Sequence, residues 1–264
     1  MTIVVKVGGA VGNSIGPVLD DLAGRKEFVL VHGGSNEVDA LGSALGRPPE
    51  YYTSPSGVVS RRSSPAHLEV VILALAGKVQ TEIVAALAQR GVRAVGLSGV
   101  DGALVVARRK EGAREVVNGR TIRVTDDWSG SIERVNTDLL GSLLQAGIAP
   151  VVGPPAVTDV GEVVNVDADR VASRIAVAIQ AEALLLLTNV PGLLRDPADP
   201  SSLVPLLKLS NFEEGLALAQ GRMRKKLLAA REAREGGVGR VMLSSSAGPA
   251  PVAAALAGAG TEVR

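Results

Sequence analysis

The stretch Thr2–Gly12, TIVVKVGGAVG, decides how the rest of the chain is interpreted. Its apolar residues predict a short buried strand, which Lys6 interrupts and which ends at Gly8 and Gly9. A lysine in a buried strand is costly unless it faces a partner. Open α/β sheets bind ligands at the carboxyl ends of their strands, where an ammonium group beside backbone N–H groups suits a phosphate. The stretch therefore indicates a phosphate site, but an edge-strand lysine before a tight turn fits the same residues.

Composition narrows the class of protein. The chain has 264 residues, enough for one large α/β domain or two small lobes. A net charge of +1 and an aromatic content of 2% argue against a nucleic-acid binder. Cysteine is absent, which excludes disulfides, thiolate metal sites and a cysteine nucleophile. We see no run of about 18 uncharged apolar residues and no signal peptide, so we expect a cytoplasmic protein.

Apolar β-like runs alternate with helical patterns along the whole chain. This alternation predicts an α/β fold of three layers, with a mainly parallel open sheet between helices. A second buried strand over 28–31 runs into His32, Gly33, Gly34 and Ser35, which repeats the glycine pair of the first strand. Two such strand ends side by side would line one crevice, although His32 alone also fits a structural histidine.

The segment 47–64 predicts a lid followed by a helix start. RPPEYYTSPSGVV (47–59) is rich in turn residues and predicts a loop or a hairpin over a site. Arg61 and Arg62 follow, and an arginine beside a lid suits bidentate capture of a carboxylate, or is simply solvated. Ser64 and Pro65 then open a long helix that ends at Gly91. Its apolar stripe, which includes Leu75 and Val79, predicts core or a subunit interface.

A basic hairpin is predicted at 108–123. The segment carries six cations against two carboxylates, a net charge of +4 over this stretch, and Asn118-Gly119 is typical of a two-residue turn. The basic residues are Arg108, Arg109, Lys110, Arg114, Arg120 and Arg123. The hairpin is either a solvated surface feature or a docking surface for an acidic macromolecule.

Two later segments carry polar groups near helix starts. In EVVNVDADR (162–170), Asn165, Asp167 and Asp169 alternate before a helical run, where they either bind substrate and orient lysines or cap the helix. In GRMRKK (221–226), basic residues lie at the start of a helix, whose N–H groups and dipole favour an anion. A charged solvent-facing helix is the alternative for the second segment.

Several common catalytic motifs are absent from the sequence. There is no G-x-x-x-x-G-K-[ST] loop and no G-x-G-x-x-G opening a helix after a strand. There is also no H-E-x-x-H zinc motif and no G-x-S-x-G elbow. Any phosphate would therefore be bound by strand-end glycines and scattered lysines.

Taken together, the motifs resemble the amino acid kinase family along the whole chain. They are VVKVGG (4–9), VHGGS (31–35), the Ser-Arg pair with its helix (60–77), VNVDAD (164–169), LTNVPGL (187–193) and GRMRKK (221–226). Within that family the chain is similar to the acetylglutamate kinase group, and more so to the LysZ type. LysZ-type kinases phosphorylate α-aminoadipate held on the LysW amino-group carrier protein. The segments YTSPSG (52–57), GLSGVDG (96–102) and AQGRM (219–223) carry the closer similarity.

This resemblance implies transfer of the ATP γ-phosphoryl group to a side-chain carboxylate, with magnesium held chiefly by phosphates and water. It makes Lys6 and Lys226 the catalytic cations and Asp169 the group that holds them. It assigns substrate binding to Gly33, Gly34, Arg61 and Asn165. It assigns nucleotide binding to Gly8, Gly9, Thr188, Asn189, Val190, Gly192 and Met223, and Gly34 is expected to share in binding phosphate.

The resemblance also implies an organisation and a set of partners. Residues 1–180 would form an amino-terminal lobe for substrate binding and dimerisation, and 181–264 a carboxyl-terminal lobe for ATP. An acidic carrier protein would dock on the basic hairpin, and the chain would form a homodimer, with no nucleic acid or membrane partner. Carrier-bound glutamate is a second possible substrate. A conventional acetylglutamate kinase of arginine biosynthesis, or a non-catalytic sensor on the same fold, are the alternatives.

Overall fold

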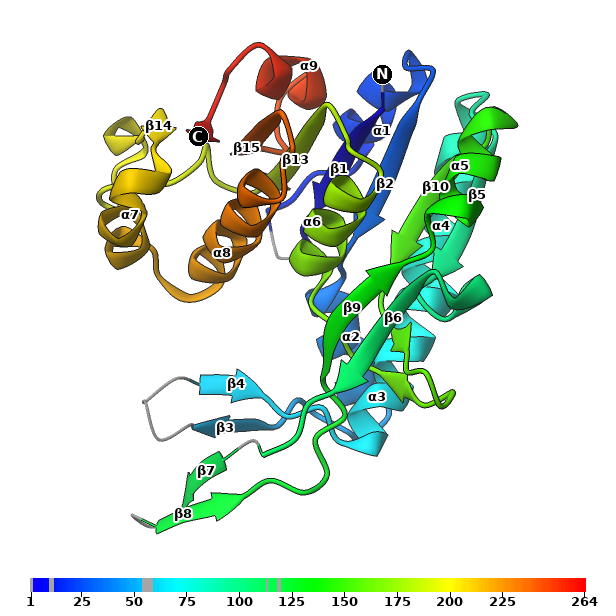
Figure 1. Cartoon of the computed structure of the whole chain (residues 1–264), viewed down its shortest axis with the longest axis vertical. Coiled ribbons are helices and arrows are strands. Elements are labelled where there is room, and N and C mark those ends of the chain that lie inside the picture. Colours follow the sequence, from blue (N-terminus) through cyan, green and yellow to red (C-terminus); the bar gives the residue numbers. More distant parts are fainter. Residues whose placement is uncertain (1, 10–11, 54–58, 113, 118–119) are drawn as a thin grey trace.

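A computed structural model describes residues 2–9, 12–53, 59–112, 114–117 and 120–264. The described residues form an eight-stranded sheet in the order β14-β16-β15-β13-β1-β2-β10-β5, with helices on both sides (Figure 1). All neighbouring strands from β15 to β5 run parallel, whereas β16 pairs antiparallel with β15. The predicted three-layer fold with a mainly parallel sheet is confirmed.

The strands of this sheet follow the apolar runs of the sequence. They are β1 Ile3–Val7, β2 Phe28–His32, β5 Ala94–Ser98, β10 Ala149–Gly153, β13 Ala183–Thr188, β14 Leu206–Leu207, β15 Arg240–Ser245 and β16 Thr261–Val263. The α-helices are α1 Gly16–Ala23, α2 Ser35–Ala44, α3 Pro65–Val71, α4 Gln80–Gln89, α5 Thr137–Gln145, α6 Ala168–Ala178, α7 Phe212–Leu218, α8 Gly221–Glu235 and α9 Pro251–Leu256. The short strands β14 and β16 carry too few residues for a period to be recognised in the sequence.

Side chains of β1 alternate between two apolar layers, as the period of a strand requires. Val4 belongs to the core on the side of α6 and α8, whereas Val5 belongs to the core on the side of α1 and α9. Lys6 follows Val4 at a spacing of two, so it points towards α6 and α8. This placement brings the lysine under the two helices that carry Asp169 and Lys226.

Strand β1 lies where the order of the sheet reverses. Its neighbours are β2 on one side and β13 on the other, so the chain leaves β1 in one direction and returns later to its opposite edge. In open α/β sheets, a crevice forms at the carboxyl ends of strands at such a point. The two glycine pairs, Gly8-Gly9 and Gly33-Gly34, follow β1 and β2 at this edge.

A second group of strands extends from one end of the sheet (Figure 1). A four-stranded sheet joins β12 Val163–Val164, β11 Ala156–Val157, β6 Val105–Arg109 and β9 Gly130–Val135. Two hairpins project beyond it, β3 Tyr51–Thr53 with β4 Val59–Arg61, and β7 Arg114–Val117 with β8 Arg120–Arg123. The predicted lid and basic hairpin are thus both hairpins, while residues 54–58 and the predicted turn 118–119 lie outside the described residues.

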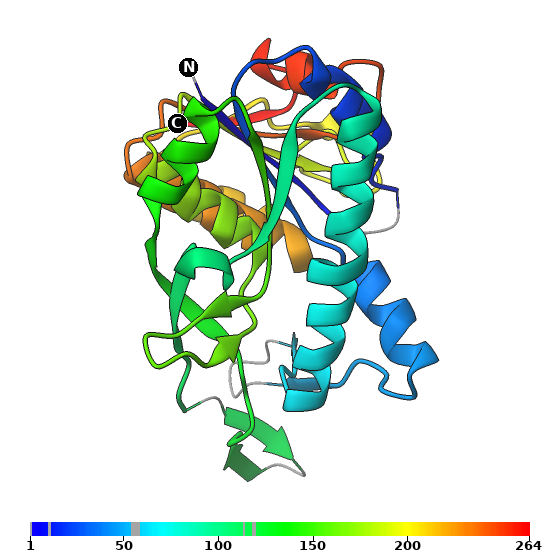
Figure 2. The same ribbon diagram turned by 90° about the vertical axis from the view of Figure 1, so that its right-hand side faces the viewer.

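The predicted long helix runs along one flank of the molecule (Figure 2). It consists of α3, the π-helical segment η1 Ile72–Val79 and α4, and Ser64 caps it by accepting the N–H of His67 at 3.3 Å. By length and composition alone, 65–89 would pass as a membrane span, but so would a core helix of a soluble protein. Its sheet-facing side packs against β5 and β10.

Of Leu75 and Val79, which the sequence offered for core or a subunit interface, Leu75 is buried and Val79 is half-buried. Leu75 is 6% exposed, and its Cδ2 would lie 2.5 Å from a Cβ on Gly34, with Cγ2 of Val79 at 3.3 Å. The large apolar side chains of this helix that are exposed are Ile72 and Leu73, at 38% and 48%. The π-helical turn shifts the register of the stripe, which an unbroken period of 3.6 residues does not anticipate.

Candidate active site

Three charged side chains from distant parts of the chain meet at the carboxyl end of β1. Lys6 Nζ and Lys226 Nζ each lie 2.8 Å from Oδ1 of Asp169. All three residues are buried, with exposures of 5% to 7%. Two ammonium groups on one carboxylate oxygen leave a net charge of +1 in a buried crevice, which suits an anionic ligand.

The start of α6 assigns separate roles to the two aspartates of the VNVDAD motif. Asp167 is the N-cap, and its Oδ1 accepts the N–H groups of Asp169 at 2.9 Å and Arg170 at 3.3 Å. Asp169 lies in the first turn, and its side chain is turned to the lysines instead. The capping alternative therefore holds for Asp167, while Asp169 takes the charge-pairing role.

Burial and charge pairing act against each other on these pKa values. Burial raises the pKa of Asp169, but the ammonium groups of Lys6 and Lys226 outweigh it and hold the pKa far below the ordinary value. Burial lowers the pKa of Lys6, yet the Asp169 carboxylate raises it above 10.5 overall. For Lys226, burial and the nearby Lys6 ammonium together outweigh Asp169 and lower the pKa to about 8. An incoming anion would stabilise the protonated form of both lysines.

The glycine pairs supply a close backbone turn above the lysines. A Cβ on Gly9 would overlap the backbone of Gly34, and a Cβ on Gly33 would lie 3.8 Å from Lys6 Nζ. Gly34 also precedes α2, so the positive end of that helix faces the crevice. Gly8 donates its N–H to the carbonyl of Leu187 at 3.2 Å, so in this structure that N–H is already used.

The residues expected to bind substrate are held by partners that the sequence did not reveal. Arg61 pairs with Asp39 at 2.6 Å, and its guanidinium lies 5.8 Å from the ring centroid of Tyr51. Asn165 donates its side-chain N–H to the hydroxyl of Ser63 at 3.1 Å. No sequence pattern predicts that Asp39 or Ser63 belongs to the site, because each contacts its partner only through tertiary packing.

Backbone hydrogen bonds fix Asn165 further. Its N–H donates to the carbonyl of Trp128 at 2.8 Å, and its carbonyl accepts the N–H of Gly130 at 2.7 Å. Trp128 in turn donates its N–H to the carbonyl of Ser63 at 2.7 Å. Residues 63, 128 and 165 are therefore linked in a ring of hydrogen bonds. This ring joins the start of the long helix, the segment before β9 and the loop before α6.

Apart from Gly8 and Gly9 at the end of β1, the residues expected to bind nucleotide lie around the carboxyl end of β13 and the start of α8. Thr188 ends β13 at 5% exposure, and its hydroxyl donates to Asn189 Oδ1 at 3.3 Å. Gly192 packs against Thr261, whose hydroxyl accepts the N–H of Leu193 at 2.8 Å. Met223 lies in the first turn of α8 and packs partly buried on the core. Val190, between Asn189 and Gly192, is half-buried.

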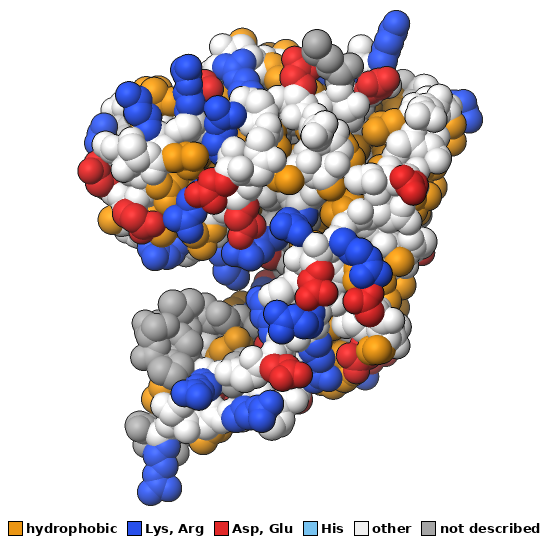
Figure 3. Space-filling model, in the orientation of Figure 1, with side chains coloured by type: hydrophobic (Ala, Val, Ile, Leu, Met, Phe, Trp, Pro, Cys, Tyr) orange, Lys and Arg blue, Asp and Glu red, His pale blue; other side chains and the backbone are white. Residues whose placement is uncertain are grey.

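The six basic residues of the predicted hairpin divide between two places. Arg108, Arg109 and Lys110 belong to β6 and the residue after it, whereas Arg114, Arg120 and Arg123 belong to β7 and β8. Figure 3 shows Lys and Arg side chains gathered in the hollow between the main sheet and the projecting hairpins.

A bound magnesium ion would find few ligands in the protein. The described part of the chain holds no group of three or more His, Cys, Asp or Glu side chains placed to bind a metal. The carboxylate nearest the reacting groups, Asp169, is taken up by two lysines. These observations fit a magnesium ion held mainly by phosphate oxygens and water.

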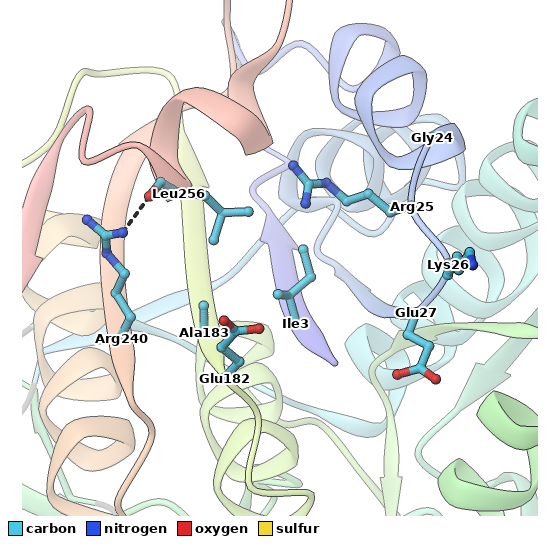
Figure 4. A pocket seen from close by; sticks show the side chains of 9 residues that line it. All are labelled: Ile3, Gly24, Arg25, Lys26, Glu27, Glu182, Ala183, Arg240 and Leu256. Atoms are coloured by element: carbon cyan, nitrogen blue, oxygen red, sulfur yellow. Dashed lines mark hydrogen bonds between the residues drawn. The ribbon is translucent and has the colours of Figure 1, made fainter. Parts of the chain in front are cut away.

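A separate cavity of about 630 Å³ lies at the opposite, amino-terminal ends of β1, β13 and β15 (Figure 4). The first residues of these strands, Ile3, Ala183 and Arg240, line the cavity. The Arg240 guanidinium donates a hydrogen bond to the carbonyl of Leu256. Because ligands of open α/β sheets bind at the carboxyl ends of the strands, this cavity is not the candidate active site.

The fold and this arrangement of residues agree with the family comparison. The model of the amino acid kinase family matches residues 1–245. The chain therefore belongs to the amino acid kinase family.

Relatives place the chain within that family. It is 46% identical over 265 residues to a [LysW]-aminoadipate kinase of Deinococcus radiodurans, covering 99% of this chain and 91% of the relative. It is 45% identical over 268 residues to a [LysW]-aminoadipate kinase of Thermus thermophilus, covering 99% and 100%. An acetylglutamate kinase of Methanopyrus kandleri is 38% identical over 264 residues, at 99% coverage of both chains.

Solved structures share the fold. The Streptococcus mutans protein smu.665 superposes with a TM-score of 0.76 at 22% identity, covering 99% of this chain and 98% of the other. An isopentenyl phosphate kinase of T. acidophilum superposes with a TM-score of 0.63 at 16% identity and full coverage of both chains. At these identities the likeness concerns the fold alone.

Proposed function

We propose that this chain is a cytoplasmic kinase that transfers the ATP γ-phosphoryl group to the side-chain carboxylate of α-aminoadipate, giving an acyl phosphate in lysine biosynthesis. The α-aminoadipate would be borne by an acidic LysW-type carrier protein, and carrier-bound glutamate is a second substrate. The observation that carries the proposal is the pair of buried lysines on Asp169 at the carboxyl end of β1. Two full-length relatives named [LysW]-aminoadipate kinase support the substrate.

The chemistry joins two anions, so the protein must neutralise charge and align the reactants. Lys6 and Lys226 would contact the oxygens of the transferred phosphoryl group, and Asp169 would hold both ammonium groups at a fixed separation. Backbone N–H groups of Gly9 and Gly34 would bind phosphate oxygens at the positive end of α2. The protein supplies no covalent intermediate in this scheme.

The substrate's α-substituents would be held by Arg61 and Asn165, with Gly33 lying against the substrate beside Lys6. A guanidinium has five N–H donors, so Arg61 can keep its ion pair with Asp39 while it binds a carboxylate. The Ser63 hydroxyl accepts one Asn165 N–H and so orients the amide. The remaining amide groups of Asn165 would face the acylated α-nitrogen.

Nucleotide binding would fall to residues 181–264, with 1–180 binding the amino-acid substrate and forming the dimer. The nucleotide site would comprise Thr188, Asn189, Val190, Gly192 and Met223 of this lobe, together with Gly8 and Gly9, which reach it from the amino-terminal lobe. Because Gly8 already donates to Leu187, its part would be to let the phosphates approach the backbone closely. Magnesium bound with ATP would further neutralise the phosphate charge.

The projecting basic residues would attract the acidic carrier before the substrate enters the crevice. Charge reversal of Arg108, Arg109 and Lys110 to Glu should weaken carrier binding strongly. The difference in affinity between wild type and this variant should shrink as the salt concentration is raised, because salt screens the charges. An affinity for the carrier that the triple change leaves intact would contradict this docking surface.

A homodimer would bury the exposed apolar side chains of the long helix. Ile72 and Leu73 are 38% and 48% exposed on η1, and adjacent large apolar residues of this kind indicate an interface. We expect Leu73→Glu to shift the protein from dimer to monomer in sedimentation velocity. A wild-type chain that sediments as a monomer at micromolar concentration would contradict the dimer.

An acetylglutamate kinase of arginine biosynthesis is the second candidate, since the relative from Methanopyrus kandleri covers the whole chain. The cluster of cations along β6 and β7–β8 favours the carrier-dependent reaction, because a small free substrate needs no such surface. A non-catalytic sensor would not need both lysines and the aspartate, and all three are present here.

Trapping of the acyl phosphate as a hydroxamate separates these functions. The enzyme would be incubated with ATP, magnesium and either carrier-bound α-aminoadipate or free N-acetylglutamate. Hydroxamate formed only with the carrier-bound substrate would support the lysine pathway. Hydroxamate formed with N-acetylglutamate alone would make this an acetylglutamate kinase, and none with either substrate would favour the sensor.

A further inference from the structure

The side chain of His32, the last residue of β2, is buried on the face of the main sheet opposite Lys6. His32 is 1% exposed and pairs in register with Val7 of β1. Because neighbouring residues in register share a face, its ring points with Val7 into the apolar layer that includes Ile83 of α4. No step of the proposed reaction uses this buried polar ring.

Two glycines of the sheet make room for His32 and for Gln80. A Cβ on Gly153 of β10 would lie 2.5 Å from Nε2 of His32, and a Cβ on Gly96 of β5 would lie 2.7 Å from Cγ and Nε2 of Gln80. Gln80 is the first residue of α4 and is 8% exposed. The ring and the amide therefore lie over strand positions that have no side chain, between the sheet and the long helix.

The ring contacts the glycine turn of the candidate active site through Nδ1, which lies 3.3 Å from the carbonyl oxygen of Gly33. A carbonyl only accepts hydrogen bonds, so Nδ1 must carry a proton and donate it. The N–H of Gly33 donates in turn to the carbonyl of Val7 at 3.1 Å. Both polar groups of Gly33 are therefore held by the protein, one by β1 and the other by His32.

The hydrogen bond to the Gly33 carbonyl also sets the direction of the next N–H group. The peptide between Gly33 and Gly34 is trans, and in a trans peptide the C=O and the following N–H point in opposite directions. Since the Gly33 carbonyl is turned to His32, the Gly34 N–H is turned away from the ring, towards the side of the sheet that carries Lys6. This is one of the N–H groups that would bind a phosphate oxygen in the proposed reaction.

The far side of the ring shows which partner the other nitrogen needs. Nε2 of His32 and Oε1 of Gln80 are both buried, and neither has a hydrogen-bond partner in the part of the chain that the structure describes. Burial and the Lys6 ammonium lower the pKa of His32, in spite of the Gly33 carbonyl and the Gln80 amide beside it. The ring is therefore neutral near pH 7 and presents only a lone pair at Nε2. The Gln80 amide satisfies this lone pair when it turns an N–H to the ring.

We propose that His32 is a positioning residue of this kinase, whose Nδ1–H holds the Gly33 carbonyl and thereby aims the Gly34 N–H at a phosphate oxygen, while Gln80 donates to Nε2. This inference rests on the proposed function and adds to it a buried polar link between the glycine turn and the long helix. His32 touches no reactant and acts only through the peptide that joins Gly33 and Gly34.

Two substitutions of His32 separate positioning from packing, with kcat measured by hydroxamate trapping. His32→Leu fills the apolar layer but donates no hydrogen bond, so kcat should fall about 10- to 100-fold while the free energy of unfolding stays near wild type. His32→Asn is smaller and should lose stability, yet its side-chain N–H can reach the same carbonyl and should keep kcat within about fivefold. A higher kcat for His32→Leu than for His32→Asn would reduce the ring to packing and overturn the proposal.

The protonation of the ring can be measured apart from catalysis. The chain has two histidines, so His67→Gln leaves His32 as the single imidazole in a nitrogen-15 spectrum. We expect a neutral ring with its proton on Nδ1, and adding Gln80→Met should shift the Nε2 signal because its donor is lost. A proton on Nε2, or an Nε2 signal that Gln80→Met leaves unchanged, would overturn the proposal. A wild-type enzyme that phosphorylates neither carrier-bound α-aminoadipate nor N-acetylglutamate would instead overturn the proposed function, whatever the ring shows.

Discussion

Gly9 and Gly34 are in backbone contact, so that a Cβ on Gly9 would overlap the Cα and N of Gly34. These residues end the two glycine pairs that follow β1 and β2. Their contact brings the start of α2 over the end of β1, next to Lys6. The repeated strand-end glycines of the sequence are therefore two halves of one turn.

Gly9→Ala should lower kcat/KM for ATP at least about 100-fold, because the new methyl group must push the start of α2 away from the lysines. Gly141→Ala inside α5 is the matched control, since a Cβ at Gly141 meets nothing within 4 Å. Alanine at this helix position should leave activity unchanged and stabilise the fold by about 0.5–1 kcal/mol. Near-normal kinetics of Gly9→Ala would show that the turn is free to adjust.

Lys6→Met and Lys226→Met should each reduce kcat by about 100-fold or more, because each removes a cation aimed at developing charge. Either change leaves Asp169 paired with the remaining lysine. Thermal unfolding should therefore show a folded protein in both cases. A kcat within tenfold of wild type in either variant would contradict a catalytic role for that lysine.

Asp169→Asn should destabilise the protein as well as inactivate it. The substitution leaves two buried ammonium groups without a carboxylate, and the loss of one partner of a buried pair costs about 3–5 kcal/mol. Urea unfolding of this variant beside Lys6→Met measures the difference. If the aspartate variant proved as stable as the lysine variant, the carboxylate would not be what holds the two cations together.

The lysines of the active site could be found in the sequence because each lies in a local signal. Lys6 interrupts an apolar strand just before a glycine pair, and Lys226 lies near the start of a basic helix. The parallel sheet followed from alternating apolar runs. In these cases, the pattern that predicts the feature spans fewer than about fifteen consecutive residues, so an analysis of hydrophobic periodicity can detect it.

Other parts of the site depend on contacts between distant segments. Asp39 pairs with Arg61, and Ser63 with Asn165, across 22 and 102 residues of chain. No local period distinguishes such a polar side chain from a solvated one. Which large apolar side chains of the long helix face solvent was not predicted for a related reason, since the segment Ile72–Val79 is π-helical and leaves Ile72 and Leu73 exposed. Strand β9 was missed because its charged residues Glu133 and Arg134 break the apolar pattern.

Stability should fall as the pH drops below about 6.5, the ordinary pKa of histidine. Burial lowers the pKa of both His32 and His67 in the folded protein, so the unfolded chain binds protons first. Between the unfolded and folded pKa values, each histidine removes about 1.4 kcal/mol per pH unit from the free energy of unfolding. Urea titrations from pH 7.5 to 5.5 measure this slope, and His67→Gln should reduce it. A free energy of unfolding that stays constant over this range would contradict the burial of the two rings.

The activity at high pH should depend on Lys226. Its pKa is lowered to about 8, first by burial and then by the Lys6 ammonium. As the pH rises through this value, the free enzyme loses the positive charge that would meet the phosphates, and kcat/KM for ATP should fall about tenfold per pH unit. Lys226→Arg keeps its charge throughout the range, so its profile should stay flat above pH 8 even if its rate is lower. An alkaline limb that persists unchanged in Lys226→Arg would assign this titration to a different group.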